Sequence, residues 1–294
     1  FFLHQIVVTV DGGPRTHREI YTMDWDGANQ KKITNHRTVA ISPDWSPDGK
    51  LIAYTAFITR KIGKRGQMKK NPDLHMYEVQ SGRRWLVSYR DGMNSGANFL
   101  RNSTELLVTL SGKTANIFRM SLDGKSISPL TNGPGTAMNV EPAVSPDGSK
   151  IAFSSDRSGK PMIFTMNPDG TGVKQLTFAG HYNSTPTWSP DGKKIAFAGV
   201  DRDKSADGRG GAFDIFIINA DGTGLKRLTS ARKPNGRWAN NESPSFAPDG
   251  QRVMFVSDRT TNSQLFMVNI DGTNERRITY DNKFYSKPKW GPAL

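Results

Sequence analysis

The sequence predicts an all-β fold, a six-bladed β-propeller whose blades are four-stranded antiparallel sheets. Two short phrases alternate along the 294 residues, and each occurs six times. Successive copies of the second phrase lie 42 to 55 residues apart, which is the period of propeller blades. The repeated segments are short, rich in β-branched and aromatic residues, and bounded by Asp-Gly turns, whereas helical repeats would need apolar residues at a 3.6-residue spacing.

The first phrase is a Pro-x-aromatic step that leads into Ser-Pro-Asp-Gly and then into an apolar run. We interpret it as strand a, a tight turn and strand b, since Pro, Asp and Gly are residues that tight turns favour. One weaker copy keeps the apolar rhythm without the turn residues, and the last copy contains only strand a. The copies span residues 43–55, 97–109, 142–154, 186–198, 244–256 and 288–292.

The second phrase is an apolar segment that ends in Gly, usually as Asp-Gly, and leads to a segment with a Leu-Thr or Ile-Thr step. It predicts strand c, a turn and strand d. The Asp-Gly turns need no metal, because Asp can bond its own backbone and Gly accepts a positive φ. The copies span residues 20–27, 76–82, 117–124, 163–170, 215–222 and 265–272.

The two ends of the sequence predict how the ring closes. Residues 5–10 form a good strand b and are followed by strands c and d, whereas residues 288–292 supply only a strand a. We therefore expect the N-terminal strands b, c and d to join the C-terminal strand a in one blade. Radial repetition of this kind leaves only short sheet edges.

Composition limits the possible chemistry. The chain has no cysteine, which excludes disulfides, thiolate metal sites and thiol nucleophiles. Its five histidines show no paired ligand spacing, and neither a nucleophile elbow nor a phosphate-binding loop is present, so we predict no catalytic residues, no metal site and no cofactor. No apolar run approaches the roughly 18 residues of a membrane span. The net charge of +13 favours anionic partners.

A polar column precedes strand a. The residues three positions before each repeat Pro, or before the Ala97 that replaces it, include four asparagines. Two interpretations stay open: the amides cap the loop between strand d and the next strand a, or they form a polar recognition ring around one mouth of the channel. The column consists of Ala40, Asn94, Asn139, Asn183, Asn241 and Tyr285.

Long inserts between strands b and c are predicted on the same face as this column, because alternate connections of an antiparallel blade emerge together. Residues 57–73 and 200–212 are the longest, and both are basic. Each is either a solvated charge run or part of a binding surface. The first insert supplies a predicted basic rim of Arg60, Lys61, Lys64, Arg65, Lys69 and Lys70.

Apolar and aromatic residues beside a basic rim suit the recognition of an acidic protein surface. Such residues occur in the loops between strand d and the next strand a, next to the asparagine column. They are Trp238, His181, Tyr182, Met93, Met138 and Phe284.

The repeats resemble the propeller of the TolB family. The resemblance covers essentially the whole chain and is carried by SPDGKKIAF (189–197), NPDGTGVKQLT (167–177), DWDGANQKKIT (24–34) and the ending KFYSKPKWGPAL (283–294). It implies a periplasmic, non-catalytic component of the Tol-Pal system that supports outer-membrane integrity and cell division. The implied partners are the peptidoglycan-associated lipoprotein Pal, docked over the propeller mouth, and other Tol proteins. By register, the resemblance implies contact with Pal at Met93, Asn94, Asn139, Val140, Asn183, Asn241 and Tyr285. With His181, Trp238 and Glu242 on the same face, these are the predicted partner-binding residues. Association with the membrane would be peripheral and through these partners.

The resemblance also bears on domain organisation. Family members carry a smaller α/β domain before the propeller, and nothing in residues 1–294 corresponds to it. We therefore expect a single propeller domain, and we expect it to be a monomer.

Two other functions are alternatives. An enzyme or small-ligand propeller, such as a polysaccharide lyase or the propeller of a peptidase, would use the channel as its site, with Glu141, Glu242, Asp44 and His181 as candidate groups. A nucleic-acid binder would rest on net charge alone, since no recognised motif or basic-aromatic platform is present, and nucleic acid is not among the predicted partners.

Overall fold

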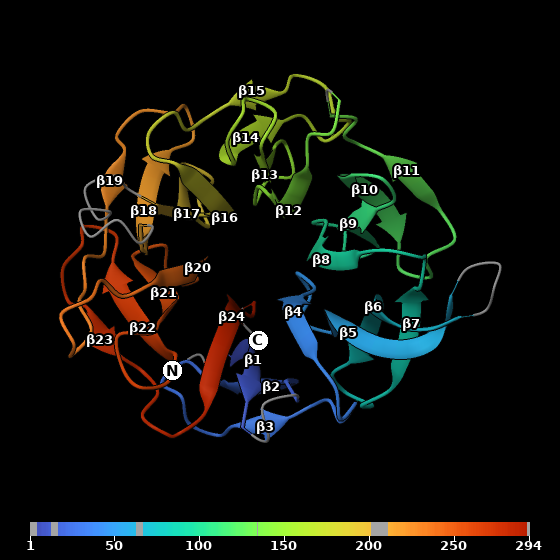
Figure 1. The fold of residues 1–294 in the computed structure, drawn as a ribbon, viewed down its shortest axis with the longest axis horizontal. Coiled ribbons are helices and arrows are strands. Elements are labelled where there is room, and N and C mark those ends of the chain that lie inside the picture. Colours follow the sequence, from blue (N-terminus) through green and yellow to red (C-terminus); the bar gives the residue numbers. More distant parts are fainter. Residues whose placement is uncertain (1–4, 13–16, 63–66, 134, 201–210, 293–294) are drawn as a thin grey trace.

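Six four-stranded antiparallel sheets are arranged around a central axis in the computed structural model, which describes residues 5–12, 17–62, 67–133, 135–200 and 211–292 (Figure 1). We number the blades 1 to 6 in chain order, starting with the blade that contains the N-terminal strands. In each blade, one edge strand of the sheet lies nearest the axis in Figure 1, and the other three follow outward. The predicted six-bladed all-β propeller is confirmed.

The strands of blades 1 to 3 follow one another from the axis outward. Blade 1 consists of β24 (Phe284–Trp290), β1 (Gln5–Asp11), β2 (Glu19–Asp24) and β3 (Lys31–Lys32). Blade 2 consists of β4 (Ala40–Trp45), β5 (Leu51–Ile62), β6 (Gln67–Glu78) and β7 (Arg84–Ser88). Blade 3 consists of β8 (Asn94–Phe99), β9 (Glu105–Ser111), β10 (Ala115–Ser121) and β11 (Ile127–Pro129).

Blades 4 to 6 have the same order. Blade 4 consists of β12 (Asn139–Val144), β13 (Ile151–Ser155), β14 (Met162–Met166) and β15 (Lys174–Gln175). Blade 5 consists of β16 (Tyr182–Trp188), β17 (Lys194–Val200), β18 (Phe213–Asn219) and β19 (Lys226–Arg227). Blade 6 consists of β20 (Asn241–Phe246), β21 (Arg252–Ser257), β22 (Gln264–Asn269) and β23 (Arg276–Arg277).

The repeated turn residues are explained by hydrogen bonds. In the first Ser-Pro-Asp-Gly turn, the Ser46 hydroxyl donates to Asp48 Oδ1 at 2.6 Å and accepts from the Leu51 N–H at 2.9 Å. Gly49 follows with a φ of 71°, a conformation that glycine adopts without a steric penalty. The predicted role of these residues as plain turns accounts for all the contacts that the structure shows there.

The Thr of the Leu-Thr or Ile-Thr step has an equally local role. Thr34 is buried, and its hydroxyl accepts the backbone N–H of Ile20 at 2.8 Å, which ties strand d back to strand c. This bond gives the buried backbone N–H of Ile20 an acceptor that it would otherwise lack. Four other blades repeat it with Thr131, Thr177, Thr229 and Thr279.

The hydrophobic core is divided among the interfaces between blades. Six clusters of buried side chains occur, and each contains residues from two neighbouring blades. Between blades 1 and 2, for example, Val7 and Ile20 pack with Trp45 and Ile52. A blade is thus stable only with neighbours on both sides, as expected for a repeat that cannot bury its faces alone.

The ring closes by pairing between β1 and β24, as predicted. Ile6 pairs with Trp290, and Val7 pairs with Lys289. Blade 1 therefore contains one strand from the end of the chain and three from its beginning. Strand β2 lies on the outer side of β1 and pairs with it over six residue pairs, from Gln5 with Asp24 to Val10 with Glu19.

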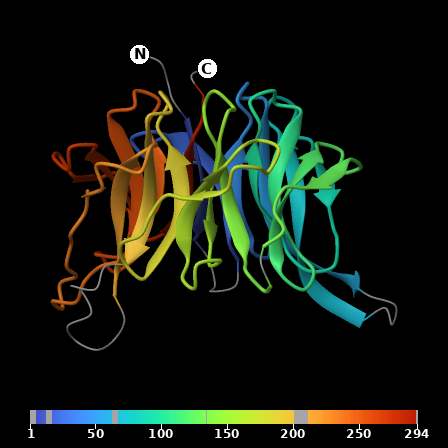
Figure 2. The same ribbon diagram turned by 90° about the horizontal axis from the view of Figure 1, so that it is seen from above.

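The two faces of the disc differ in their connections (Figure 2). We call the face with the loops from strand d to the next strand a, and from strand b to strand c, the mouth face. The opposite face carries the Ser-Pro-Asp-Gly and Asp-Gly turns, and we call it the turn face. Strands β5 and β6 extend beyond the other strands on the mouth face and end near residues 62 and 67 (Figure 2).

This extension corrects the prediction that residues 57–73 form a loop. Phe57 pairs with Pro72, and the ladder continues through Arg60 with Lys69 to the last described pair. The segment is therefore a two-stranded ribbon, because the antiparallel pairing of β5 with β6 continues into it. The insert 200–212 is described only at its ends, and its predicted basic residues Arg202, Lys204 and Arg209 lie outside the described residues.

Deletion of residues 287–294 is expected to open the ring, because it removes Lys289 and Trp290 from the β1 pairing. The melting temperature should fall by roughly 10 °C or more, and the exposed edge of β1 should promote aggregation. Thermal unfolding monitored by circular dichroism measures this. A control chain that lacks only residues 293–294 should melt like the full chain, and an unchanged melting temperature of the longer deletion would contradict the closure.

Candidate functional site

A ring of six residues surrounds the central channel, one from each innermost strand. Each ring residue immediately precedes the repeat Pro, or Ala97 in blade 3, and lies where the strand has a register irregularity. All six have a positive φ, between 51° and 62°. The ring consists of Ser42, Gly96, Glu141, Thr185, Ser243 and Lys287.

A positive φ is uncommon for residues other than Gly, and only Gly96 of the ring is a glycine. The bulge in each strand imposes this conformation, because two residues of the strand have no partner on strand b. Strained backbone of this kind is concentrated at functional sites in proteins. The ring is therefore the first candidate for a site.

An ion pair crosses the channel within this ring. Lys287 Nζ lies 2.9 Å from Glu141 Oε1, and the other carboxylate oxygen of Glu141 accepts the Thr185 N–H at 2.8 Å. Lys287 belongs to β24 and Glu141 to β12, on opposite sides of the ring in Figure 1. Both side chains remain about one third exposed, at 36% and 32%, so the pair lies in the channel and not in the packed wall.

Each member of the pair changes the titration of the other. Burial raises the pKa of Glu141, but the Lys287 ammonium and the Thr185 N–H outweigh it, and the net pKa lies below the usual range. Burial lowers the pKa of Lys287, and the carboxylates of Glu141 and Glu242 more than restore it, so its net pKa is raised. Both groups are charged at neutral pH.

The ring separates two cavities on the channel axis. On the side of the turn face, a cavity of about 80 Å³ is lined by the repeat prolines, Asn98 and Lys289. On the side of the mouth face, a cavity of about 390 Å³ is open to solvent. Because the ring residues line both cavities, the ion pair forms the floor of the larger one, which we call the mouth cavity.

The walls of the mouth cavity combine apolar and acidic side chains. Met93 and Val140 lie on one part of the wall, and Tyr182 and Phe213 lie on another, with their ring centroids 5.5 Å apart in an edge-to-face arrangement. The Glu242 side chain also lines the cavity and is exposed. A concave surface with apolar walls and a few charged groups is typical of binding sites.

Glu242 differs from Glu141 in its side-chain contacts. No hydrogen bond or ion pair of the Glu242 carboxylate occurs in the described part of the chain. Burial raises its pKa, and the carboxylates of Asp258 and Glu141 raise it further, while Lys287 opposes them. Tyr182 is affected similarly: burial and the nearby Glu141 raise its pKa.

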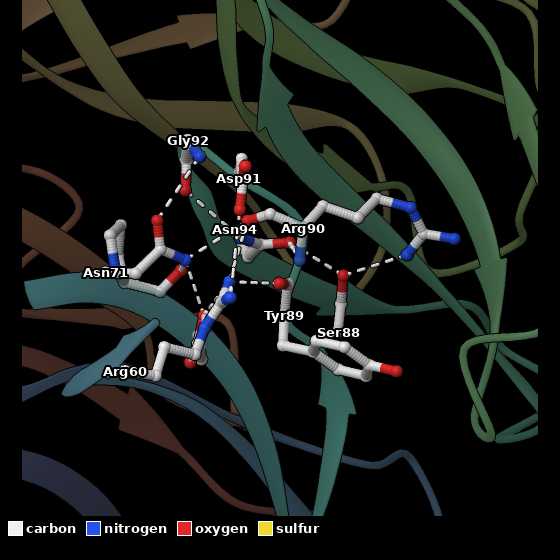
Figure 3. A network of polar contacts seen from close by, with 10 residues as sticks. Arg60, Asn71, Ser88, Tyr89, Arg90, Asp91, Gly92 and Asn94 are labelled. Atoms are coloured by element: carbon white, nitrogen blue, oxygen red, sulfur yellow. Dashed lines mark hydrogen bonds and ion pairs between the residues drawn. The ribbon is translucent and has the colours of Figure 1, made fainter. Parts of the chain in front are cut away.

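The asparagine column does not form a polar ring at the mouth. Figure 3 shows Asn94 buried in a network under the loop that precedes β8. Its amide donates to the carbonyl oxygens of Arg90 at 2.6 Å and Gly92 at 3.1 Å, and its Oδ1 accepts the Ser88 hydroxyl at 2.7 Å. The loop-capping interpretation describes this residue, and its side chain is not available to a partner.

The other members of the column are also buried, with exposed fractions of 0% to 3%. The Asn183 amide donates to the Ala179 carbonyl at 3.0 Å. Asn139 and Asn241 instead accept from the guanidinium groups of Arg157 and Arg259. Tyr285, at 1% exposure, donates its hydroxyl hydrogen to Asp281 at 2.7 Å. The predicted polar ring is corrected accordingly for Asn94, Asn139, Asn183, Asn241 and Tyr285.

Arg60 is likewise not part of a free basic rim. Its Nε lies 3.0 Å from Asp73 Oδ2, and its Nη2 donates to the Tyr89 carbonyl (Figure 3). It therefore joins the ribbon to the loop before β8. Lys61, Lys69 and Lys70 are exposed on the ribbon, whereas the predicted rim residues Lys64 and Arg65 lie outside the described residues.

The remaining predicted contact residues are distributed over the mouth face. Met93, Val140 and Glu242 line the mouth cavity. His181 is exposed, and Trp238 is half-buried with the Arg232 guanidinium 3.8 Å from its ring centroid; neither lines the cavity.

Of the four groups proposed for an enzymatic site, Glu141 and Glu242 line the mouth cavity, whereas Asp44 and His181 do not. Asp44 is buried in the channel wall, where its Oδ2 accepts Asn98 Nδ2 at 3.0 Å and the Phe99 N–H at 3.1 Å. Among the described residues, no group of three or more His, Asp or Glu side chains is placed to hold a metal ion. The same residues contain no helix long and apolar enough to cross a membrane.

Lys287 is absent from the predicted site because the predicted column lies three positions before the repeat Pro. Lys287 could have been found from its position directly before the repeat Pro, because the bulge in the strand turns the residue at that position toward the channel. The sequence predicted four further residues on this face, but not that they form a second column. The residue just before the asparagine column is an exposed large apolar side chain in four blades: Met93 at 39%, Met138 at 48%, Tyr182 at 41% and Phe284 at 47%.

We call the four exposed apolar residues Met93, Met138, Tyr182 and Phe284 the apolar crown. The class of protein is therefore a six-bladed propeller with an apolar crown on one face and a channel cavity whose floor is an ion pair. Residues 1–207 and 204–293 match the family described as TolB beta propeller domain. The chain belongs to this family, as the sequence motifs predicted.

Individual proteins give the same result. The chain is 32% identical over 93% of its length to the Tol-Pal system protein TolB of Bordetella pertussis, and it spans only 57% of that relative. A crystal structure of TolB from Acinetobacter baumannii superposes with a TM-score of 0.81 at 26% identity, over 99% of this chain and 67% of that one. An oligogalacturonate lyase solved with manganese shares the fold alone, with a TM-score of 0.56 at 14% identity over 94% of this chain and 73% of that one.

Replacing Lys287 by Met should leave the Glu141 carboxylate without its counter-ion in the channel. We expect the free energy of unfolding to fall by about 2 kcal/mol, somewhat less than for a fully buried pair. The double variant E141Q/K287M should recover most of this loss. Urea unfolding at pH 7 measures both, and equal stability of the single and double variants would argue against a stabilising pair.

Asp44 should make stability depend on pH. Burial raises its pKa from 3.8 to about 6, against the opposing effects of Lys289 and of the hydrogen bonds from Asn98 and Phe99. An acid whose folded pKa is raised favours folding most below its unfolded pKa, and this contribution is lost as pH rises through about 6. The loss is about 3 kcal/mol at most.

Asp44→Asn should therefore become more stable relative to the original chain as pH rises from 4 to 7. Above pH 7 the difference should be constant. Urea unfolding of both proteins at several pH values gives this difference directly. A difference that does not change with pH would show that Asp44 titrates normally.

Proposed function

We propose that this chain is a non-catalytic, protein-binding propeller of the Tol-Pal system in the periplasm. In this proposal its mouth face binds a Pal-like peptidoglycan-associated lipoprotein, and the complex supports outer-membrane integrity and cell division. Other Tol proteins of the same system are further candidate partners. The named TolB relatives support the assignment to this system.

The observation that carries the proposal is the apolar crown on the mouth face, of which Met93 and Tyr182 line the mouth cavity. Four large apolar side chains occupy the same register position in their blades and remain exposed on one face. Exposed apolar groups that gather on one face of a soluble protein commonly mark a protein-binding surface. Aromatic residues and Met are also the residue types enriched where protein partners meet.

The charge around the crown favours an acidic partner. Lys61, Lys69 and Lys70 are exposed on the ribbon, which projects from the mouth face (Figure 2). Basic groups at the edge of an interface mainly accelerate association with an acidic surface and make it sensitive to salt. Acid–base catalysis by two carboxylates would need both of them free to exchange protons. In the mouth cavity Glu141 is paired with Lys287, so Glu242 has no such second carboxylate, which supports a non-catalytic role.

Isothermal titration calorimetry with the soluble domain of the cognate Pal tests the proposal. Micromolar binding is expected for the original chain. Met93→Glu should weaken it by at least about tenfold, because it removes an apolar contact and places a negative charge against an acidic partner.

Val173→Glu is the matched control. Val173 has the same exposed fraction as Met93, 39%, but follows an Asp-Gly turn on the turn face. Its replacement introduces the same charge and should leave affinity unchanged. Absence of heat at micromolar concentration, or equal loss in both variants, would refute the proposed surface.

A further inference from the structure

The mouth cavity has a floor whose charges are already satisfied. Lys287 and Glu141 bind each other at 2.9 Å, and Glu141 also accepts the Thr185 N–H. A ligand that enters the cavity thus meets a neutral pair at the bottom. The specificity of the cavity must come from its walls.

One carboxylate of the wall has no direct partner. Glu242 lines the cavity from β20, and in the described part of the chain its carboxylate has no hydrogen-bond or ion-pair partner. Three charged neighbours act on it: the Lys287 ammonium, whose effect is the largest of the three, and the like charges of Asp258 and Glu141. The Lys287 ammonium is held by Glu141, so Glu242 is the group that a ligand can neutralise.

Aromatic side chains lie beside this carboxylate. Tyr182 and Phe213 line the same cavity, and the Tyr182 hydroxyl is close enough to Glu242 and Glu141 to feel their charge. A carboxylate next to an aromatic wall is the combination that recognises ammonium and guanidinium groups, since both attract a cation. Met93 and Val140 can pack against the methylene stem of such a group.

We propose that the mouth cavity receives one lysine or arginine side chain of the docked partner, with its cationic head at Glu242 and its stem against the apolar wall. This inference rests on the proposed function for the identity of the partner, although the cavity can be tested without it. The partner would be acidic over the surface that meets the ribbon and would carry a single basic residue opposite the channel. Such an arrangement fixes the rotation of the partner on a disc that is otherwise nearly six-fold.

Three amino-acid amides test the cavity directly. N-acetyl-lysine methylamide and N-acetyl-arginine methylamide should bind with millimolar affinity in an NMR titration of the full chain. N-acetyl-norleucine methylamide, which has the apolar stem of lysine but no charge, should bind at least about fivefold more weakly.

Glu242→Gln should remove the preference for the charged amides and leave norleucine binding unchanged. Glu78→Gln is the control for net charge, because Glu78 lies at a turn-face hairpin and pairs with Arg83 there. Three results would overturn the proposal: equal binding of the charged and uncharged amides, no detectable binding of the charged amides at about 50 mM, or full preference retained in Glu242→Gln.

The same variants separate this inference from the proposed function. With the soluble domain of Pal, Glu242→Gln should weaken binding about tenfold and Glu78→Gln should not. If Pal fails to bind the original chain, the proposed function fails and the amide titration still decides the cavity. If Pal binds all three proteins equally, the proposed function stands and the cationic side chain is excluded.

Discussion

The pairing of β1 with β24 is the interaction on which the rest of the structure depends. Each of the six core clusters lies between two blades, and the cluster of blades 6 and 1 includes Tyr285 and Trp290 of β24. This strand, the innermost of blade 1, comes from the end of the chain. The same strand carries Lys287 into the channel, and the floor of the mouth cavity is therefore formed in the same step that closes the ring.

Local sequence was sufficient to predict the architecture. Ser46 and Asp48 close their turn through contacts within five residues, and Thr34 bonds a neighbouring strand of its own blade. Interactions of such short range require the same residue types in most repeats, and the repeats then give the number of blades. The ribbon could not be predicted in the same way, because residues 57–73 carry charges and a proline rather than the apolar alternation of a buried strand.

The site was only partly predictable, for a geometric reason. A regular strand would place residues one and three positions before the Pro on the same side, and on that basis Asn94 and its equivalents would face the channel. The bulge breaks that alternation. The pairing of Glu141 with Lys287 joins residues 146 positions apart, and no local pattern indicates it. Met93 and Glu242 could be predicted because they lie beside the column, not because the column itself reaches the surface.

The bulge has a consequence for how such a channel can vary. Its backbone is determined by the strand pairing and the following Pro, while the side chain before that Pro is Ser, Gly, Glu, Thr, Ser or Lys in the six blades. The scaffold thus tolerates small, acidic and basic groups at equivalent positions. Substitutions at these six positions can therefore change the charge and the width of the channel. The turns and the core clusters between blades contain none of these residues.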